Sequence, residues 1–187
     1  MEQNDITIIG GGFAGLACAR AAAARGMKIA VLERKSCPGD GIRTTGILVQ
    51  EAADLLGLPT HLGKSIRGVR LYAPGGKSID LCSPGYSFVA TDTPGMMRWL
   101  AQQALLVGAE IRLSSNVSDF KRGADHISLP EAGLETRFLV GCDGARSNVA
   151  RRFGLSANRE FLLGVEAEYE GIGGLDPDRL HVFLDSL

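Results

Sequence analysis

The stretch that decides the fold is ITIIGGGFAGLACARAAAARGMKIAVLE, Ile6 to Glu33. It opens with a short β-branched run that ends at Gly10, which is typical of a buried parallel strand. An alanine-rich segment follows and stops at Gly26, as a helix with a C-terminal glycine does. A second apolar run, Lys28 to Glu33, completes a βαβ unit. The spacing therefore predicts an α/β domain with a parallel sheet.

Three glycines at the first strand-to-helix turn form a ligand-binding pattern. Gly10, Gly12 and Gly15 have G-x-G-x-x-G spacing, with a strand before them and a helix after them. In this pattern Gly10 permits a tight turn, Gly12 lets a pyrophosphate approach the backbone, and Gly15 lets the helix pack closely on the strand. The phosphates would lie at the positive end of the helix dipole. We therefore predict a dinucleotide-binding loop.

An acidic residue ends the second predicted strand. Glu33 is placed where a carboxylate accepts hydrogen bonds from a ribose 2′-OH and repels a 2′-phosphate. The alternative is a solvated charge at the strand end, paired with Arg34. The glycine loop alone fits FAD, NAD and NADP enzymes, whereas Glu33 favours the adenosine of FAD or NAD.

A second glycine-marked turn occurs late in the chain, in VGCDGARSNV, Val140 to Val149. Asp143 and Gly144 make a turn between an apolar strand and a basic, helix-like segment that Ser147 is placed to cap. From these residues alone, Asp143 either orients a phosphate-bearing or ribityl ligand or caps a turn. Both interpretations stay open at this point.

Composition limits the class of partner. The 187 residues can bury one or two cores, and 20 Lys and Arg against 21 Asp and Glu leave a formal charge of −1. The chain has no excess of positive charge that would attract nucleic acid, so we expect its partner to be a small molecule. The four cysteines lack metal or disulfide spacing and no signal peptide is evident, which favours the cytoplasm. No apolar run is long enough for a transmembrane segment. Peripheral membrane contact and the oligomeric state are left open.

The rest of the chain alternates between helix and strand patterns. Helical spacing predicts helices over residues 47–57 and 94–108. Short alternating runs predict strands over residues 66–73, 77–82, 86–91, 109–113, 117–122, 126–129, 136–141, 161–171 and 179–185. We assign the parallel α/β domain to residues 1–63 and 92–155, and a β-rich domain to residues 64–91 and 156–187.

The two motifs, in this order, resemble those of the flavoprotein superfamily of para-hydroxybenzoate hydroxylase type. That superfamily includes FAD monooxygenases, geranylgeranyl reductases, halogenases and lycopene cyclases. The segments GIRTTGIL and GVEAEYEG incline the resemblance toward the geranylgeranyl reductase-like branch. It implies a Rossmann-like FAD-binding parallel sheet with an inserted β-rich substrate domain. Members are longer and carry a third FAD motif downstream, so we expect this chain to be the N-terminal part.

The resemblance also implies which residues bind the cofactor. The glycine loop would hold the FAD pyrophosphate, Glu33 the adenosine ribose, and Asp143 with Gly144 the region of the pyrophosphate and ribityl chain. Arg43 is similar in placement to arginines that reach the flavin or its phosphates, with a surface arginine as the alternative. The full predicted set is Gly10, Gly12, Gly15, Glu33, Arg34, Arg43, Asp143 and Gly144.

One departure limits the comparison. The superfamily usually has an arginine three residues after the serine of the second motif, where this chain has Ala150, with Arg151 one position later. This weakens any role for Arg151. We name no catalytic residue and no metal ligand.

The function implied is that of an enzyme, an FAD-dependent oxidoreductase. Flavin would transfer hydride to a double bond of a hydrophobic substrate, for example an isoprenoid, with NAD(P)H as the reductant. One alternative is an FAD-dependent NAD(P)H monooxygenase that hydroxylates an aromatic or polyketide substrate. Another is a non-catalytic nucleotide-binding module.

Overall fold

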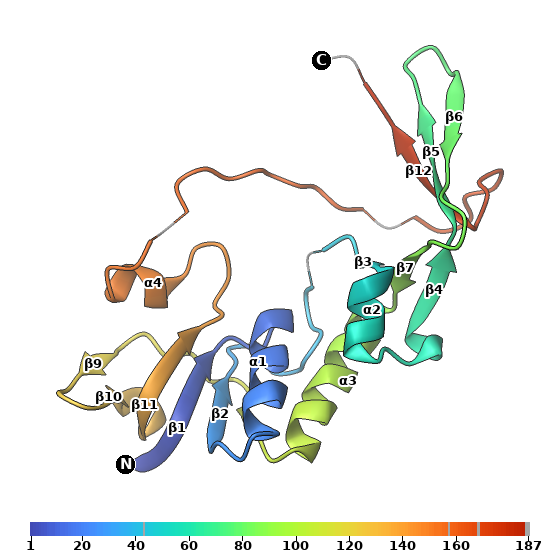
Figure 1. Cartoon of the computed structure of the whole chain (residues 1–187). Helices are drawn as coiled ribbons and strands as arrows, with labels where there is room; N and C mark the ends of the chain where they lie inside the picture. Colours follow the sequence, from blue (N-terminus) through green and yellow to red (C-terminus); the bar gives the residue numbers. More distant parts are fainter. Residues whose placement is uncertain (43, 157, 168, 186–187) are drawn as a thin grey trace. The chain divides into compact units, whose positions relative to one another are not determined.

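A computed structural model describes residues 1–42, 44–156, 158–167 and 169–185 (Figure 1). The chain forms two compact units. Unit 1 comprises Met1–Ile42 and Met97–Leu163, and unit 2 comprises Arg43–Met96 and Gly164–Leu187.

Unit 1 is built on a six-stranded sheet of order β8-β2-β1-β11-β10-β9. Its strands are β1 (Glu2–Ile9), β2 (Ile29–Leu32), β8 (Glu110–Arg112), β9 (Lys121–Arg122), β10 (Ile127–Leu129) and β11 (Leu134–Gly141). The four strands β8, β2, β1 and β11 run parallel, while β10 and β9 continue the sheet antiparallel. The predicted α/β class with a parallel sheet is confirmed.

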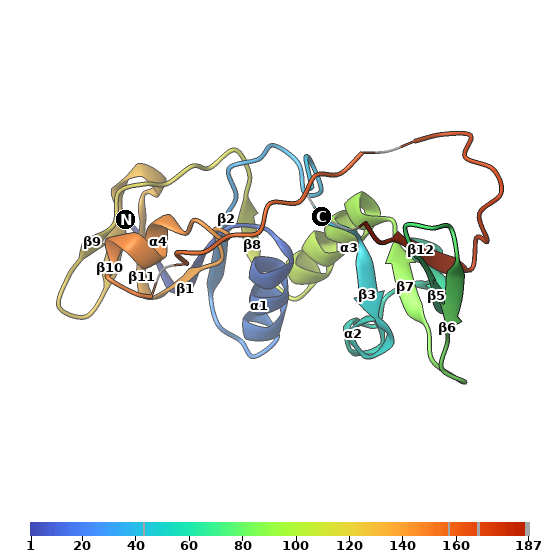
Figure 2. The same cartoon turned by 90° about the horizontal axis from the view of Figure 1, so that it is seen from above.

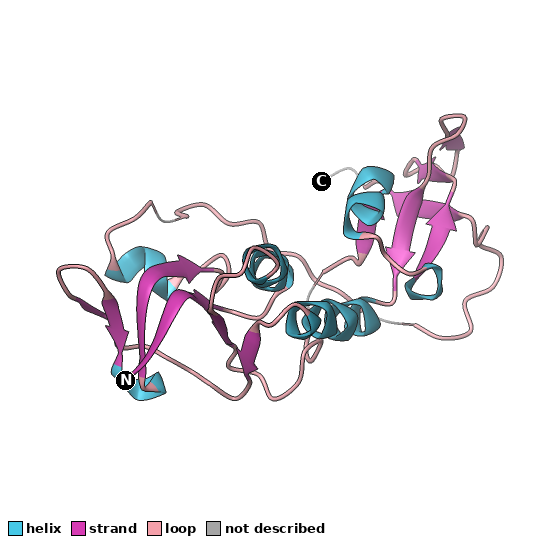
Figure 3. Ribbon diagram, turned by 60° about the horizontal axis from the view of Figure 1, so that its bottom comes forward, coloured by secondary structure: helices cyan, strands magenta, loops and turns pink. Residues whose placement is uncertain are grey.

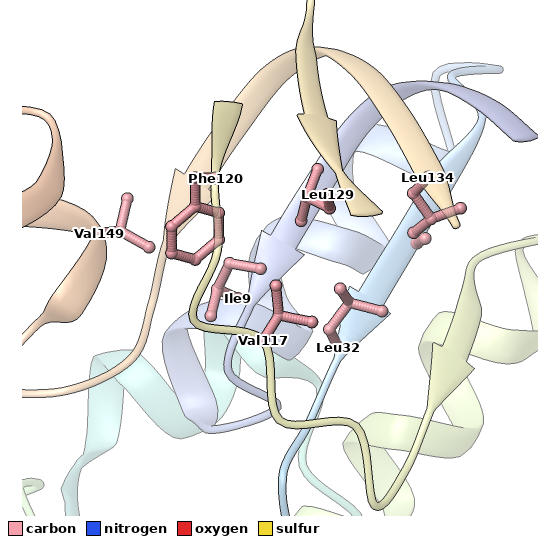
Figure 4. Close-up of a cluster of buried hydrophobic side chains, with 8 residues drawn as sticks. Ile9, Leu32, Val117, Phe120, Leu129, Leu134 and Val149 are labelled. Atoms are coloured by element: carbon pink, nitrogen blue, oxygen red, sulfur yellow. The ribbon is translucent and has the colours of Figure 1, made fainter. Parts of the chain in front are cut away.

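All four residues of β2 and the last three of β1 are buried, which explains the apolar runs at the centre of the parallel sheet. Helices α1 (Phe13–Ala23) and α3 (Thr93–Leu106) contribute alanines to one cluster, and these small side chains let α1 approach the sheet. Figure 2 shows α1 beside β2. That cluster contains Ile8, Ala19, Ala23, Ile29, Val31, Ala104 and Ala109. A second cluster contains Ile9, Ala30, Leu32, Val117, Phe120, Leu129, Leu134 and Val149 (Figure 4).

Register brings two distant segments to one edge of this sheet. Ile9 at the end of β1 pairs with Gly141 at the end of β11. The Cys142 backbone N–H then donates to the Ile9 carbonyl at 2.7 Å. The turns that follow the two strands therefore begin side by side.

Unit 2 contains two three-stranded sheets (Figure 3). The first has the order β3-β7-β4 and is antiparallel, and the second, β12-β5-β6, joins an antiparallel hairpin to the parallel strand β12. The elements are β3 (Ile47–Val49), α2 (Gln50–Leu56), η1 (Thr60–Leu62), β4 (Gly63–Ile66), β5 (Gly68–Tyr72), β6 (Ser78–Leu81), β7 (Phe88–Thr91) and β12 (Arg179–Phe183). Tyr72 stacks on Phe183 across β5 and β12 with ring centroids 4.4 Å apart.

Three sequence predictions of secondary structure are wrong. The strand predicted over residues 117–122 forms only at β9 (Lys121–Arg122), and residues 117–120 have no regular structure. The helix predicted over residues 47–57 begins only at Gln50, because residues 47–49 pair with β7 as a strand. The strand predicted over residues 161–171 is not formed by the described residues of that range. Its alternating apolar pattern is present, but no neighbouring strand supplies backbone partners to those residues, and the Leu162 side chain is fully exposed.

Residues 43–63 fall in unit 2 because β3 and β4 both pair with β7. The division of the chain into an FAD-binding α/β domain at residues 1–63 and 92–155 and a β-rich substrate domain at residues 64–91 and 156–187 stays a prediction.

Candidate functional site

The glycine loop between β1 and α1 has the shape its spacing predicts. Gly10 has φ +103°, and a Cβ there would overlap the Cys142 carbonyl oxygen. A Cβ on Gly15 would overlap the Gly10 carbonyl oxygen, so α1 lies directly against the loop. At Gly12 a Cβ would meet no heavy atom within 4 Å. Gly10 and Gly15 therefore allow close packing, and Gly12 borders open space.

Glu33 links the end of β2 to the glycine loop. Its Oε2 accepts a hydrogen bond from the Gly11 backbone N–H at 2.6 Å, and its Oε1 accepts one from the Lys35 N–H at 2.9 Å. Among the described residues no ion pair joins Glu33 to Arg34, whose side chain is exposed. The carboxylate therefore orders the loop, and each oxygen keeps capacity to accept a further hydrogen bond.

The second motif leads into the short helix α4 (Asn148–Arg152). Ser147 is its N-cap, and the Ser147 hydroxyl accepts from the Ala150 N–H at 2.9 Å. The predicted cap is confirmed. Gly144 has φ +88°, which glycine adopts readily, and it lets the chain turn between β11 and this cap.

Asp143 braces the same turn. One carboxylate oxygen accepts from the Ser147 hydroxyl at 2.5 Å, and the other accepts from the backbone N–H groups of Asn148 at 2.6 Å and Val149 at 3.2 Å. Burial alone would raise the pKa of Asp143, but the hydrogen bonds from Ser147, Val149 and Asn148 outweigh it and hold the pKa below its ordinary value. Asp143 therefore stays ionised at neutral pH and shapes the turn.

A groove of about 590 Å³ lies at the carboxyl edge of the parallel strands in unit 1. Its volume is within the usual range for ligand pockets. Six of the predicted residues line it: Gly10, Gly12, Glu33, Arg34, Asp143 and Gly144. Gly15 lies beneath the loop, against Gly10, and Arg43 lies outside the described residues. The fold thus brings both glycine motifs to one groove.

Sequence reasoning missed several groove residues. The remaining lining residues are Ile9, Leu32, Lys35, Ser115, Asn116, Val117, Ser118, Cys142, Arg146, Asn148 and Arg151. Ser115 to Ser118 belong to no motif and reach the groove only because β8 lies beside β2. Arg151 was discounted because it lies one residue later than the arginine of the superfamily, but it does line the groove. An arginine within one residue of the expected position was therefore the sequence feature that could have identified it.

Cys142 lines the groove without the properties of a nucleophile. Burial, followed by the proximity of Cys18 and Asp143, raises the pKa of the Cys142 thiol. The thiol is therefore mainly protonated at neutral pH. Within residues 1–42, 44–156, 158–167 and 169–185, no three His, Cys, Asp or Glu side chains are grouped to hold a metal ion. No helix in the described part of the chain has the length and apolarity needed to cross a membrane.

These features define the class of protein. A glycine loop that is open at Gly12, a carboxylate at the end of the neighbouring parallel strand and a groove at the carboxyl edge are those of a Rossmann-like dinucleotide-binding domain. Residues 5–92 match the profile of the family described as FAD dependent oxidoreductase. The predicted relationship to FAD-dependent oxidoreductases is confirmed.

Curated relatives agree with this relationship. The chain is 26% identical over 177 residues to digeranylgeranylglycerophospholipid reductase 2 of Methanosphaera stadtmanae, an alignment that covers 86% of this chain and 44% of the relative. It is 29% identical over 162 residues to rifampicin monooxygenase of Rhodococcus hoagii, covering 80% and 33%. The chain therefore spans less than half the length of these relatives.

Solved structures share the fold. A geranylgeranyl bacteriochlorophyll reductase-like protein from Thermoplasma acidophilum superposes with a TM-score of 0.79 at 21% identity, covering all of this chain and 51% of the other. The p-nitrophenol 4-monooxygenase PnpA from Pseudomonas putida superposes with a TM-score of 0.69 at 20% identity, covering 83% and 45%.

Proposed function

We propose that unit 1 binds FAD in the groove. The observation that carries the proposal is the convergence of both glycine motifs and Glu33 on one groove. The pyrophosphate would lie at Gly12 and the N-terminus of α1, where unsatisfied N–H groups and the helix dipole favour anions. Glu33 would accept from the adenosine ribose. Gly144 and the turn braced by Asp143 would adjoin the pyrophosphate and ribityl chain.

The remaining members of the predicted set have supporting roles in this proposal. Gly15 would keep α1 close enough for its N-terminus to reach the phosphates. Arg34 would offset phosphate charge at the groove, and Arg43 would contact the flavin or its phosphates.

As an enzyme, the protein would be an FAD-dependent oxidoreductase that saturates a double bond of a hydrophobic, isoprenoid-like substrate, with NAD(P)H as the reductant. FAD, when bound, supplies hydride transfer. One hydride and one proton add across the double bond, so the carbon skeleton is reduced by two electrons. Support comes from the family match at residues 5–92 and from relatives named digeranylgeranylglycerophospholipid reductase. Unit 1 would hold the cofactor and unit 2 would form part of the substrate-binding region.

The first experiment is the visible absorption spectrum of the purified chain after incubation with FAD and removal of free ligand. We expect flavin absorption bands to remain with the protein, and chromatography of the released flavin to identify FAD. A protein that stays colourless would contradict the proposal. Bound flavin that no reductant bleaches would instead indicate a non-catalytic nucleotide-binding module.

A monooxygenase is the second candidate, and the similarity to rifampicin monooxygenase favours it. The two activities differ in their need for oxygen. A reductase would saturate an isoprenoid substrate under anaerobic conditions, whereas a monooxygenase would consume oxygen in proportion to NAD(P)H. Measurements of product and oxygen uptake, made on a full-length protein, separate them.

The cytoplasm is the compartment that fits the proposal. All four cysteines are free, which is consistent with a reducing environment.

A further inference from the structure

One wall of the groove is a loop without regular structure, residues 113–119, which we call the wall loop. It begins beside Glu33, because the Ser115 N–H donates to the Glu33 carbonyl at 2.8 Å and the Ser114 N–H donates to the Lys35 carbonyl at 2.9 Å. In the proposed binding mode, this is the end of the groove that receives the adenosine half of FAD.

Apolar side chains anchor the wall loop from below. Val117 and Phe120 are 8% and 3% exposed and belong to the second cluster. Figure 4 shows Ile9, from β1, beside both side chains, and Leu32, from β2, beside Val117. Ser114, with φ +52°, turns the chain into the loop. Apolar burial is not directional, so it fixes the depth of the loop without orienting its polar groups.

A carboxylate from outside the groove supplies that orientation. Glu131 lies in the short helix η2 (Pro130–Ala132), between β10 and β11. Its Oε2 accepts from the backbone N–H groups of Ser118 at 2.7 Å and Asp119 at 3.3 Å, and its Oε1 accepts from the Ser118 hydroxyl at 3.1 Å. The backbone hydrogen bonds from Ser118 and Asp119 hold the pKa of Glu131 below its ordinary value, so the carboxylate is ionised at neutral pH.

We infer that Glu131 is a positioning residue for dinucleotide binding, holding the wall loop in the shape that receives the adenosine half. The inference rests on the proposed binding of FAD. Glu131 takes both donors of Ser118, so the Ser118 hydroxyl has only acceptor capacity left for the groove. The wall therefore selects a ligand that donates there, as an adenine amino group or a ribose hydroxyl does. A loop already ordered also lowers the entropic cost of binding.

The test compares Glu131→Gln with wild type in titrations with FAD and with ADP. Glu131→Gln replaces the carboxylate that accepts from Ser118 with a neutral amide. We therefore expect the affinities for FAD and for ADP to fall together by about tenfold, the effect of losing charge-assisted hydrogen bonds. Hydrogen exchange at the Ser118 and Asp119 amides should accelerate in the unliganded variant. Asp119→Asn is the matched control, because it removes a carboxylate from the same loop without touching the bonds to Glu131, and it should bind like wild type.

The outcomes separate this inference from the proposed function. Wild-type affinity in Glu131→Gln would overturn the role of Glu131 alone, whereas failure of the wild-type chain to bind FAD and ADP would overturn both. If Glu131→Gln does not fold, Ser118→Ala, which removes both the hydroxyl donor to Glu131 and the hydroxyl acceptor available to the ligand, should lose at least about two- to threefold in ADP affinity, the effect of a single hydrogen bond. Unchanged ADP affinity in Ser118→Ala would then overturn the inference.

Discussion

Glu33 and Gly11, on neighbouring turns of the parallel sheet, are joined by a hydrogen bond of 2.6 Å from the Gly11 backbone N–H to the Glu33 Oε2. The carboxylate proposed to accept from the ribose thus also holds the loop proposed to receive the pyrophosphate. Ordering of the loop and recognition of the ribose are therefore coupled through one side chain.

This coupling predicts that two substitutions of Glu33 lower the affinity for FAD to different degrees. Glu33→Gln keeps an oxygen for the Gly11 N–H but loses the charge, and we expect FAD affinity to fall about tenfold. Glu33→Arg removes the acceptor and should largely abolish binding. Fluorescence titration with FAD measures both, with Asp125→Asn, at an exposed turn outside the groove, as the control. Undiminished affinity in Glu33→Arg would rule out the ribose role.

Gly12→Ala should separate ligand binding from stability. Because a Cβ at Gly12 meets no heavy atom within 4 Å, the free energy of unfolding should change by no more than about 1 kcal/mol, as expected of an unstrained glycine replacement. The methyl group would occupy the space proposed for the pyrophosphate, so we expect FAD affinity to fall at least about tenfold. Normal FAD binding would place the pyrophosphate elsewhere.

Gly15→Ala, unlike Gly12→Ala, should lower the stability of the unliganded protein. Its Cβ would overlap the Gly10 carbonyl oxygen, a backbone atom that cannot rotate away, so α1 must shift from the loop. We expect a loss of about 3 kcal/mol in the free energy of unfolding, the upper end for overpacking. Denaturant unfolding without ligand measures the effect, and a variant as stable as Gly12→Ala would contradict the close packing.

Replacing Asp143 with Ala should destabilise unit 1 even without ligand. Three donors at the start of α4 lose their acceptor, and we expect a loss of about 2 kcal/mol at neutral pH, the upper end for loss of a helix cap. Denaturant unfolding measures it. A stability equal to that of wild type would show that the hydrogen bonds at this turn contribute nothing.

The pH dependence of that loss follows from the lowered pKa. In the folded state the pKa of Asp143 lies below its ordinary value of 3.8. The contribution of the ionised Asp143 carboxylate to the free energy of unfolding is therefore fully present above pH 3.8, and it is lost as the pH falls through the folded-state pKa. The difference between wild type and Asp143→Ala should therefore be constant from neutral pH to just above 3.8 and shrink in stronger acid. A difference that already shrinks near neutral pH would contradict an ionised, stabilising Asp143.

The thiol of Cys142 should react slowly with alkylating reagents. Burial raises its pKa, and the groove side is where the proposed FAD would cover it. We expect carboxymethylation at neutral pH to be about tenfold slower at Cys142 than at the exposed Cys82, and slower still with FAD present. Mass spectrometry of the digested protein measures both rates, and a faster reaction at Cys142 would contradict its burial.

The sequence predicts most of unit 1 because its signals are local. The turn at Gly10, the glycine stop after α1 and the apolar runs of β1 and β2 act within a few residues of one another, and the structure forms each of them. The strand predicted over residues 161–171 fails for the complementary reason. Alternating apolar residues fit a strand, but a strand also needs a neighbour to pair with its backbone, and the pattern says nothing about that neighbour.

The residues of the candidate site also include some that the sequence could identify and others that it could not. Gly10, Gly12 and Glu33 could be identified from spacing, since a βαβ unit holds them together through its own connections. Ser118 and Glu131 carry no motif, and their hydrogen bonds join segments that meet only because β10 pairs with β11 and the wall loop packs on the second cluster.

By itself, the sequence determined the βαβ unit and its glycine loop, because glycine backbone freedom and apolar periodicity act locally. For Asp143 it left two interpretations open, a turn cap or a ligand contact. Only the tertiary structure decided that Asp143 caps its turn and lines the groove as well. The parallel pairing of Ile9 with Gly141 places the ends of β1 and β11 at one edge of the sheet, so two turns far apart in the chain form one groove.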